Sequence, residues 1–341
     1  MKKYLLIIAL LTLGVLLNGC AQEKKPAEEE KKDLVVVGFV QVGAESDWRD
    51  ANTESMRNTF TEENGYELIV ANGQQQQANQ ITAIRRFIHQ EVDYIVLAPV
   101  VEKGWETVLM EAQEAGIPVI IMDRKLNVRA SNLYAGWVGS AFDLEADKLT
   151  AWMNMYFHLE GIKPADVHIV SIQGNLGSSA QLGRTGGLEN ACRKYKWELL
   201  KETPADFTQA KAREVMTQYL QDFPNLNVVY CENDNEALGA IEAIEASGRK
   251  PGMNMRAGEI LVVSFDGVNK AALKYAKQGK IACIGECNAE HGPRVRELIE
   301  TLQQGKSIPK HTYVDEALFT AYRKIGSVYV HSTLYPVSIL E

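Results

Sequence analysis

The 341-residue chain carries 36 Lys and Arg against 44 Asp and Glu, which gives a formal net charge of −8 at pH 7. This acidic balance, with no basic stripe or recognition-helix pattern, gives no reason to expect a nucleic-acid partner. A chain of this length is too long for one typical domain and suits two. Its 46% hydrophobic content and five tryptophans are typical of a globular body rather than a disordered chain.

The first twenty residues have the pattern of an export signal. Lys2 and Lys3 precede an apolar run over 4–17, and the Leu-Asn-Gly-Cys sequence at its end resembles a bacterial lipobox. The resemblance implies that Cys20 becomes the lipid-modified N-terminus of an exported chain anchored in the cell envelope. A plain secretory signal with an incidental cysteine is the alternative. Residues 21–33, mostly charged, are predicted to form a solvated tether.

Beyond residue 33, short apolar runs alternate with helical patterns in two series, the second of which starts near residue 140. Predicted strands cover 34–37, 67–70, 94–98, 118–122, 167–172, 197–200, 228–231, 260–265 and 281–286. Predicted helices cover 79–89, 105–114, 143–159 and 236–247, with one more around 215–220. This alternation is typical of doubly wound parallel sheets and predicts the α/β class.

The loop after the first predicted strand gathers groups suited to a hydroxyl-rich ligand. Glu45, Trp48 and Arg49 stand close together just before a helix. In open α/β sheets, ligands bind beyond the carboxyl ends of the strands. Guanidinium and carboxylate groups hydrogen-bond hydroxyls, and an indole covers an apolar sugar face. The alternative is an ordinary helix start, with acids placed there by the macrodipole.

Polar residues also end most of the later predicted strands. They are Asp123 and Arg124, Gln173, Asp206, Asn233 and Asp234, and Asp266, with Arg184 in a following loop or helix start. Each Asp or Asn alone is explained as a helix cap, but a cap needs no arginine beside it. The set therefore favours a cleft lined with hydrogen-bonding groups between two similar domains.

No catalytic or metal-binding constellation competes with this interpretation. The six histidines are scattered, and the sequence has no nucleophile elbow and no phosphate-binding loop. Cys283, Cys287 and His291 are spaced four apart, but a strand over 281–286 would hold the two cysteines too far apart to ligate together. We therefore expect a binding protein with no catalytic residues, no metal and no cofactor.

Several longer motifs resemble one known family. The runs VVVGFVQVGAESDWRDA, ANGQQQQANQITAIRRFI, VDYIVLAPVVEKGWETVL and AGIPVIIMDR resemble periplasmic sugar-binding proteins of the ribose/galactose type. SIQGNLGSSAQLGR, ADFTQAK, ENDNEALGAIEAI and VVSFDGVNKAALK extend the likeness, which runs from Leu34 to Pro309. Within the family, the likeness is greatest to the galactofuranose-binding members that serve ABC importers.

The resemblance implies a type 1 periplasmic-binding-protein fold, in which two doubly wound parallel-sheet domains are joined by a three-stranded hinge. The chain would cross between the domains near Ser140, Glu286 and Tyr313. This gives an N-terminal domain over 34–140 plus 287–312 and a C-terminal domain over 141–286 plus 313–341.

Carried over position by position, the resemblance also implies a ligand pocket built from both domains. Its residues would be Glu45, Trp48, Arg49, Asp123, Arg124, Trp137, Arg184, Asp206, Phe207, Asn233, Asp266 and Glu286. At the first crossing, Ala141 and Phe142 stand where the family usually carries an Asp-Asn pair that contacts the ligand. The sugar or its ring form would therefore differ from the usual one.

The implied function is that of a solute-binding lipoprotein of an ABC importer. Such a protein would bind a monosaccharide, for example the furanose galactofuranose, and deliver it as a monomer to the permease in the membrane. A sensor that presents the sugar to a histidine kinase or chemoreceptor is an alternative that the sequence does not separate. An exported hydrolase is a third possibility, with Glu45 and Asp47 as the only close acid pair.

Overall fold

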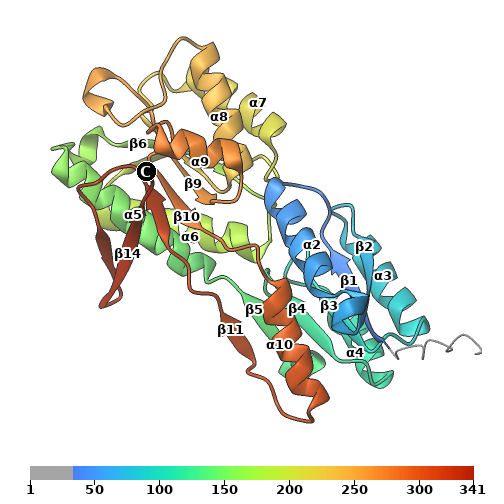
Figure 1. The fold of residues 1–341 in the computed structure, drawn as a ribbon. Coiled ribbons are helices and arrows are strands. Elements are labelled where there is room, and N and C mark those ends of the chain that lie inside the picture. Colours follow the sequence, from blue (N-terminus) through green and yellow to red (C-terminus); the bar gives the residue numbers. More distant parts are fainter. Residues whose placement is uncertain (1–33) are drawn as a thin grey trace, which may run out of the picture. The chain divides into compact units, whose positions relative to one another are not determined.

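A computed structural model describes residues 34–341, in which strands and helices alternate through two sheets (Figure 1). The export signal, the tether and Cys20 predicted above lie outside these described residues. Contacts group Leu34–Glu341 into one unit, which holds both sheets and the helices that cover them.

The first sheet has six parallel strands in the order β11-β5-β4-β3-β1-β2. The strands are β1 (Val35–Gln41), β2 (Tyr66–Asn72), β3 (Tyr94–Leu97), β4 (Val119–Met122), β5 (Gly136–Gly139) and β11 (His311–Tyr313). The helices are α2 (Asp47–Thr59), α3 (Gln77–His89), α4 (Glu106–Glu114) and α10 (Gly292–Gln303). A parallel sheet is covered on both faces, which explains why Val37, Phe39 and Val40 of β1 are all fully buried.

The second sheet has eight strands in the order β13-β14-β12-β10-β9-β8-β6-β7. Its parallel part is β6 (His168–Gln173), β7 (Glu198–Pro204), β8 (Val228–Cys231), β9 (Leu261–Asp266) and β10 (Cys283–Glu286). β12 (Leu318–Thr320) adds antiparallel to β10, and the hairpin β13 (Ser327–Val330) and β14 (Thr333–Ile339) extends the edge. The helices are α5 (Phe142–Leu159), α6 (Ser179–Tyr195), α7 (Gln209–Asp222), α8 (Asp234–Ala246) and α9 (Lys270–Lys277).

The chain passes between the two sheets three times: after β5, after β10 and after β11. The second passage returns α10 to the first sheet, where it packs against α2 and β5 although it is far from both in sequence (Figure 1). Tyr313 pairs with Gly139 in the six-stranded sheet. The parallel strands and alternating helices confirm the predicted α/β class, whereas the domain boundaries stay a prediction.

Two elements near the first crossing were not predicted. β5 is four residues long and half glycine, which hides it from a pattern search. α6 contains Gly183, Gly186 and Gly187, and glycine is a poor helix former. Packing explains the helix, because a Cβ at Gly187 would overlap that of Ala146 in α5. The glycines therefore let α5 and α6 pack closely, and they place Arg184 on a helix rather than in a loop.

Candidate functional site

The candidate pocket lies at the carboxyl ends of parallel strands from both sheets. In each sheet the strand order reverses beside one strand, β1 between β2 and β3, and β6 between β7 and β8. Ligands bind in the crevice that such a reversal opens. The pocket is lined by Glu45, Ser46, Trp48, Arg49, Asp123, Arg124, Phe142, Ala180, Arg184, Phe207, Asn233, Asp266 and Cys287. Its empty volume, which includes space open to solvent, is about 270 Å³.

The side of the pocket formed by the six-stranded sheet holds a buried cluster of two acids and two arginines. Arg49 Nε lies 3.0 Å from Glu45 Oε1, and its Nη2 lies 2.6 Å from Asp123 Oδ2. Arg124 pairs with the same oxygen of Glu45. Burial alone would raise the pKa of Asp123, but Arg49 and Arg124 hold it below its ordinary value. The cluster is therefore charged and balanced, and its charges hold one another in place.

The side formed by the eight-stranded sheet has one arginine among several acids. Arg184 lies 3.1 Å from Glu145 and 3.3 Å from Asp266, and it donates to the carbonyl of Glu232. Burial raises the pKa of Asp266 to about 7 against the opposing pull of Arg184. Burial also raises the pKa of Glu232, to about 8. Acids on this side can therefore keep a proton near neutral pH and donate a hydrogen bond.

Each pocket arginine lies over an aromatic ring. The guanidinium carbon of Arg49 is 4.6 Å from the ring centre of Trp48, that of Arg124 is 5.3 Å from Phe207, and that of Arg184 is 5.4 Å from Phe142. Such contacts stabilise a desolvated guanidinium and fix its plane. The pocket therefore combines rigid, directed donors with apolar ring surfaces.

Several pocket residues have a backbone conformation that side chains rarely adopt. Asp123, Phe207 and Asp266 have φ of 64°, 61° and 93°. Such left-handed positions cost on the order of 1–3 kcal/mol each, and they cluster at ligand sites. At each of these positions the backbone turns sharply at or just after a strand end, next to the pocket.

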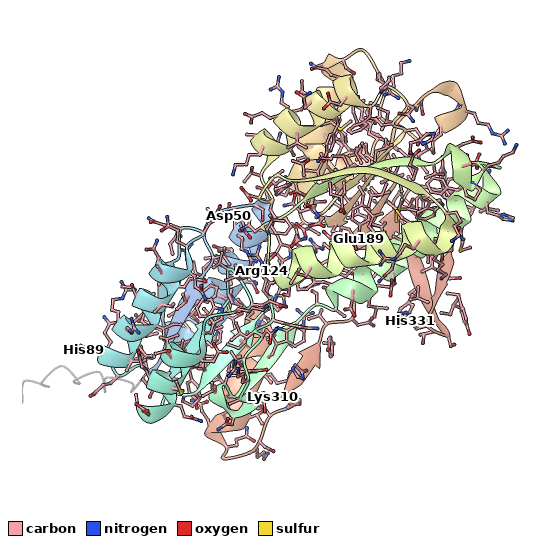
Figure 2. The ribbon with its side chains drawn as sticks, turned by 180° about the vertical axis from the view of Figure 1, so that it is seen from behind. Asp50, His89, Arg124, Glu189, Lys310 and His331 are labelled. Carbon is pink, nitrogen blue, oxygen red and sulfur yellow. The ribbon has the colours of Figure 1, made fainter. Side chains whose placement is uncertain are left out.

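Two polar atoms of the pocket residues lack a hydrogen-bond partner among the described residues. They are Arg124 Nε, a donor, and Asp123 Oδ2, which meets Arg49 only as an ion pair. Buried polar atoms are nearly always bonded, so an orphan calls for an explanation. Arg124, labelled in Figure 2, is buried, whereas Asp50, labelled in the same view, is exposed. Among the described residues, Arg124 Nε is therefore a donor without a partner beside the pocket, whereas Asp123 Oδ2 is already paired with Arg49.

Contacts also join the rims of the pocket. Asp47, at the start of α2, accepts from Asn269, and it exchanges two hydrogen bonds of 3.2 Å with Asn235 of α8. Deeper in, Asn175 donates to Glu45 at 3.0 Å. Asp47, Asn235 and Asn269 are called the rim triad below. Asn235 therefore lies at the rim of the pocket, in contact with α2.

The structure brings most of the predicted ligand residues together. Those that line the pocket are Glu45, Trp48, Arg49, Asp123, Arg124, Arg184, Phe207, Asn233 and Asp266. It adds Ser46, Phe142, Ala180 and Cys287. The sequence offers a reason to note Phe142, because the resemblance implies a polar residue at its position. It offers no such reason for Ser46, Ala180 or Cys287.

Three predicted residues do not line this pocket, each for a local reason. Trp137 is 1% exposed in the core of the six-stranded sheet, and its indole donates to the carbonyl of Asp123 from behind. Asp206, at φ 54°, turns outward to pair with Lys211. The carboxylate of Glu286 accepts hydrogen bonds from the backbone amide of Ala317 and from the side chain of nearby Asn288.

The cysteines do not gather with His291. Cys283 is buried inside β10, Cys287 lines the pocket, and the His291 ring packs edge-on against Trp48 at 5.7 Å. Within residues 34–341 all four cysteines are free. Cys283, Cys287 and His291, although spaced four residues apart, therefore pack in different surroundings and do not form one cluster.

Comparison with known proteins gives consistent matches over this region. A periplasmic binding protein domain matches residues 37–289. The galactofuranose-binding protein YtfQ of Escherichia coli is 37% identical over 238 residues, 69% of this chain and 71% of that protein.

Two solved structures are similar over most of the chain. One, from Mycobacterium smegmatis in complex with β-D-fucofuranose, is 35% identical with a TM-score of 0.78, covering 84% of this chain and 91% of that one. The other is the binding component of the arabinose ABC transporter from Shewanella sp. ANA-3, bound to L-arabinofuranose. It is 34% identical with a TM-score of 0.77, covering 84% of this chain and 91% of that one. The chain thus belongs to the periplasmic binding protein family.

Proposed function

We propose that this chain binds a monosaccharide in its furanose form and delivers it to an ABC importer. The observation that carries the proposal is the set of three buried arginines, each stacked on an aromatic ring and each paired with a carboxylate, around one pocket. Charged donors and acceptors form strong, directional bonds with hydroxyls. Trp48, Phe142 and Phe207 offer apolar faces to the carbon skeleton of a sugar.

The charge balance favours an uncharged ligand. On the six-stranded side, two arginines face two acids, and on the other side Arg184 faces Glu145 and Asp266. An anionic ligand would therefore displace an existing carboxylate from its arginine or lie beside it unpaired, which is costly in a buried site. A neutral polyol can add hydrogen bonds to each pair without breaking it.

The relatives support the ring form. The relatives named above are a galactofuranose-binding protein and two proteins bound to fucofuranose and to arabinofuranose. Phe142, in place of a polar residue, is consistent with a ligand that presents fewer hydroxyls there.

Calorimetric titration with L-arabinose, D-fucose, D-galactose and D-ribose tests the proposal, and the carbon-13 spectrum of bound, C1-labelled sugar shows the ring form. We expect micromolar or tighter binding of at least one sugar, with furanose signals only. Arg124→Met should weaken binding by at least about 100-fold, because it removes a charge-assisted donor pair. The matched control is Lys125→Met, next along the chain and outside the pocket lining. Binding of the pyranose alone contradicts the ring form, and no binding of any sugar contradicts the function.

We further propose that the partner is a membrane permease, that the chain acts as a monomer, and that lipid on Cys20 holds it at the envelope surface. No helix among the described residues has the length and apolar character needed to span a bilayer. Mass spectrometry of the mature N-terminus tests the anchor. Cys20→Ala should release the protein from washed membranes, and retention there would contradict it.

A further inference from the structure

Three segments of the chain converge on one buried acid, Glu316, which follows β11 and is 6% exposed. Its Oε1 accepts from the Ser140 hydroxyl at 2.6 Å, from the segment after β5. The same oxygen accepts from the Asn288 amide at 2.8 Å, from the segment after β10. Each residue lies on a different passage between the sheets. One carboxyl group therefore ties all three passages together.

A second buried acid stands against the first. One acceptor atom each of Glu145, Glu316 and Cys287 lie within 4.8 Å of one another. Glu145 Oε1 is buried and has no hydrogen-bond donor among the described residues. Two carboxylates this close in a buried site cannot both be charged without large repulsion. A single proton between them removes the repulsion and satisfies the orphan oxygen at the same time.

Glu145 also connects this place to the pocket. Its other oxygen, Oε2, lies 3.1 Å from Arg184, which lines the pocket and reaches Asp266 at 3.3 Å. We propose that Glu145 and Glu316 form a proton-sharing carboxyl pair that links Arg184 to the three passages between the sheets. The pair has a positioning role: Glu145 holds the guanidinium of Arg184 in place, and Glu316 holds the three passages together.

The surrounding charges support a proton rather than a metal ion at this place. The groups that face the pair are Lys148 of α5, Arg184 of α6, Asp266 at the end of β9 and Cys287 after β10. Lys148 donates to the Glu316 carbonyl at 2.6 Å. The positive charges of Lys148 and Arg184, beside the space between the two carboxyl groups, oppose the binding of a metal cation there. Burial and the charge of Glu145 raise the pKa of Glu316 to about 9, in agreement with a retained proton.

The pH dependence follows from that retained proton. An unfolded glutamate loses its proton near 4.5, whereas Glu316 keeps it to about pH 9 in the folded chain. The folded state therefore binds more protons across this window, and stability falls as pH rises from 4.5 to about 9. Glu316→Gln keeps an acceptor for Ser140 and Asn288 and supplies a permanent donor to Glu145. It should melt at a higher temperature than the wild type at pH 8.5, with a flatter pH profile.

Thermal melting of the ligand-free protein from pH 5 to 9.5 tests the pair. Ser140→Ala is the control, since it removes one bond to Glu316 and leaves the pair, so the fall in melting temperature from pH 5 to 9 should remain. A Glu316→Gln profile that runs parallel to the wild type overturns the proposal. A shift of the wild-type melting temperature on adding EDTA also overturns it, because a bound cation would then fill the gap.

A second experiment measures sugar binding, and it tests whether the carboxyl pair affects the pocket through Arg184. This experiment rests on the proposed function. With L-arabinose as the probe, raising the pH from 7 to 9.5 should weaken wild-type binding at least about five-fold more than Glu316→Gln binding, because Asp266 titrates in both proteins. Equal weakening in both proteins overturns the link. Failure of the wild type to bind L-arabinose at pH 7, with the melting profiles as expected, counts against the proposed sugar and leaves the pair standing.

Discussion

The rim triad gives a direct test of how closure contributes to affinity, through the substitution Asn235→Ala. Asn235 lies in the first turn of α8 and exchanges two hydrogen bonds with Asp47, one to its backbone amide and one to its carboxylate, both of 3.2 Å. Neither Asp47 nor Asn235 lines the pocket. The substitution therefore removes contacts between the rims without touching the groups proposed to hold the sugar.

The expected loss of binding affinity in Asn235→Ala follows from the geometry of these hydrogen bonds. Both bonds are long and at least partly exposed, so each contributes near the lower end of the usual range, about 0.5 kcal/mol. Their loss, about 1 kcal/mol in the closed form, weakens binding about five-fold. We expect the hinge to open without ligand and to break these bonds, so their loss should cost free energy only in the ligand-bound form. The change should therefore appear as faster dissociation, with the association rate almost unchanged.

Stopped-flow fluorescence of Trp48, the one tryptophan that lines the pocket, measures both rates. The control is Asn190→Ala, which removes an asparagine from a helix where it bonds only to Arg193 one turn along. The control should leave both rates unchanged. A five-fold slower association in Asn235→Ala, with normal dissociation, would refute the reasoning, since the rims would then meet before the sugar is bound.

Three further outcomes follow from the packing and charges. Arg184→Met should lower the free energy of unfolding by about 3–5 kcal/mol in urea denaturation, because buried acids lose their cation; no loss would mean that those acids are neutral. Gly187→Ala should lower the free energy of unfolding by about 1–3 kcal/mol, because the added Cβ overlaps with α5. Gly186→Ala, which has open space at its Cβ, should raise the free energy of unfolding by up to about 1 kcal/mol. Equal effects of the two substitutions would contradict the packing. Burial raises the pKa of Asp266 from 3.8 to about 7, so its contribution to stability falls as pH rises across that window, and Asp266→Asn should flatten the fall in melting temperature there.

Much of the sheet framework was predictable from the sequence, because a parallel sheet buried on both faces needs runs of apolar residues in every strand. β4 shows such a run and was placed almost correctly, whereas the run predicted over 34–37 covers only the first part of β1, which extends to Gln41. The pocket could be located for the same reason, since parallel strands end at one edge and the polar residues that follow them must gather there. The α/β class and the family were both correctly identified from these patterns.

What the sequence could not supply is the direction of single side chains. Asp206 follows β7 and Asp266 ends β9, and both have positive φ, yet Asp206 pairs outward with Lys211 and Asp266 reaches Arg184. The difference lies in which partner is within reach, and that depends on the neighbouring helix rather than on the residue itself. Glu286 does not line the pocket for the same reason, because the backbone amide of Ala317, far along the chain, donates to its carboxylate.

The two sides of the pocket differ in how firmly their charges are fixed, and this difference has a consequence for recognition. Arg49 and Arg124 keep the pKa of Asp123 low against its burial, so that side presents permanent acceptors and donors in one arrangement. Burial raises the pKa of Asp266 to about 7, so the opposite side can accept or donate according to the hydroxyl that it meets. A sugar hydroxyl has both a donor and a lone pair, and its orientation is set by the partner that cannot change. The six-stranded side should therefore select the sugar, while the eight-stranded side, which moves its proton to match, completes the bonds as the site closes.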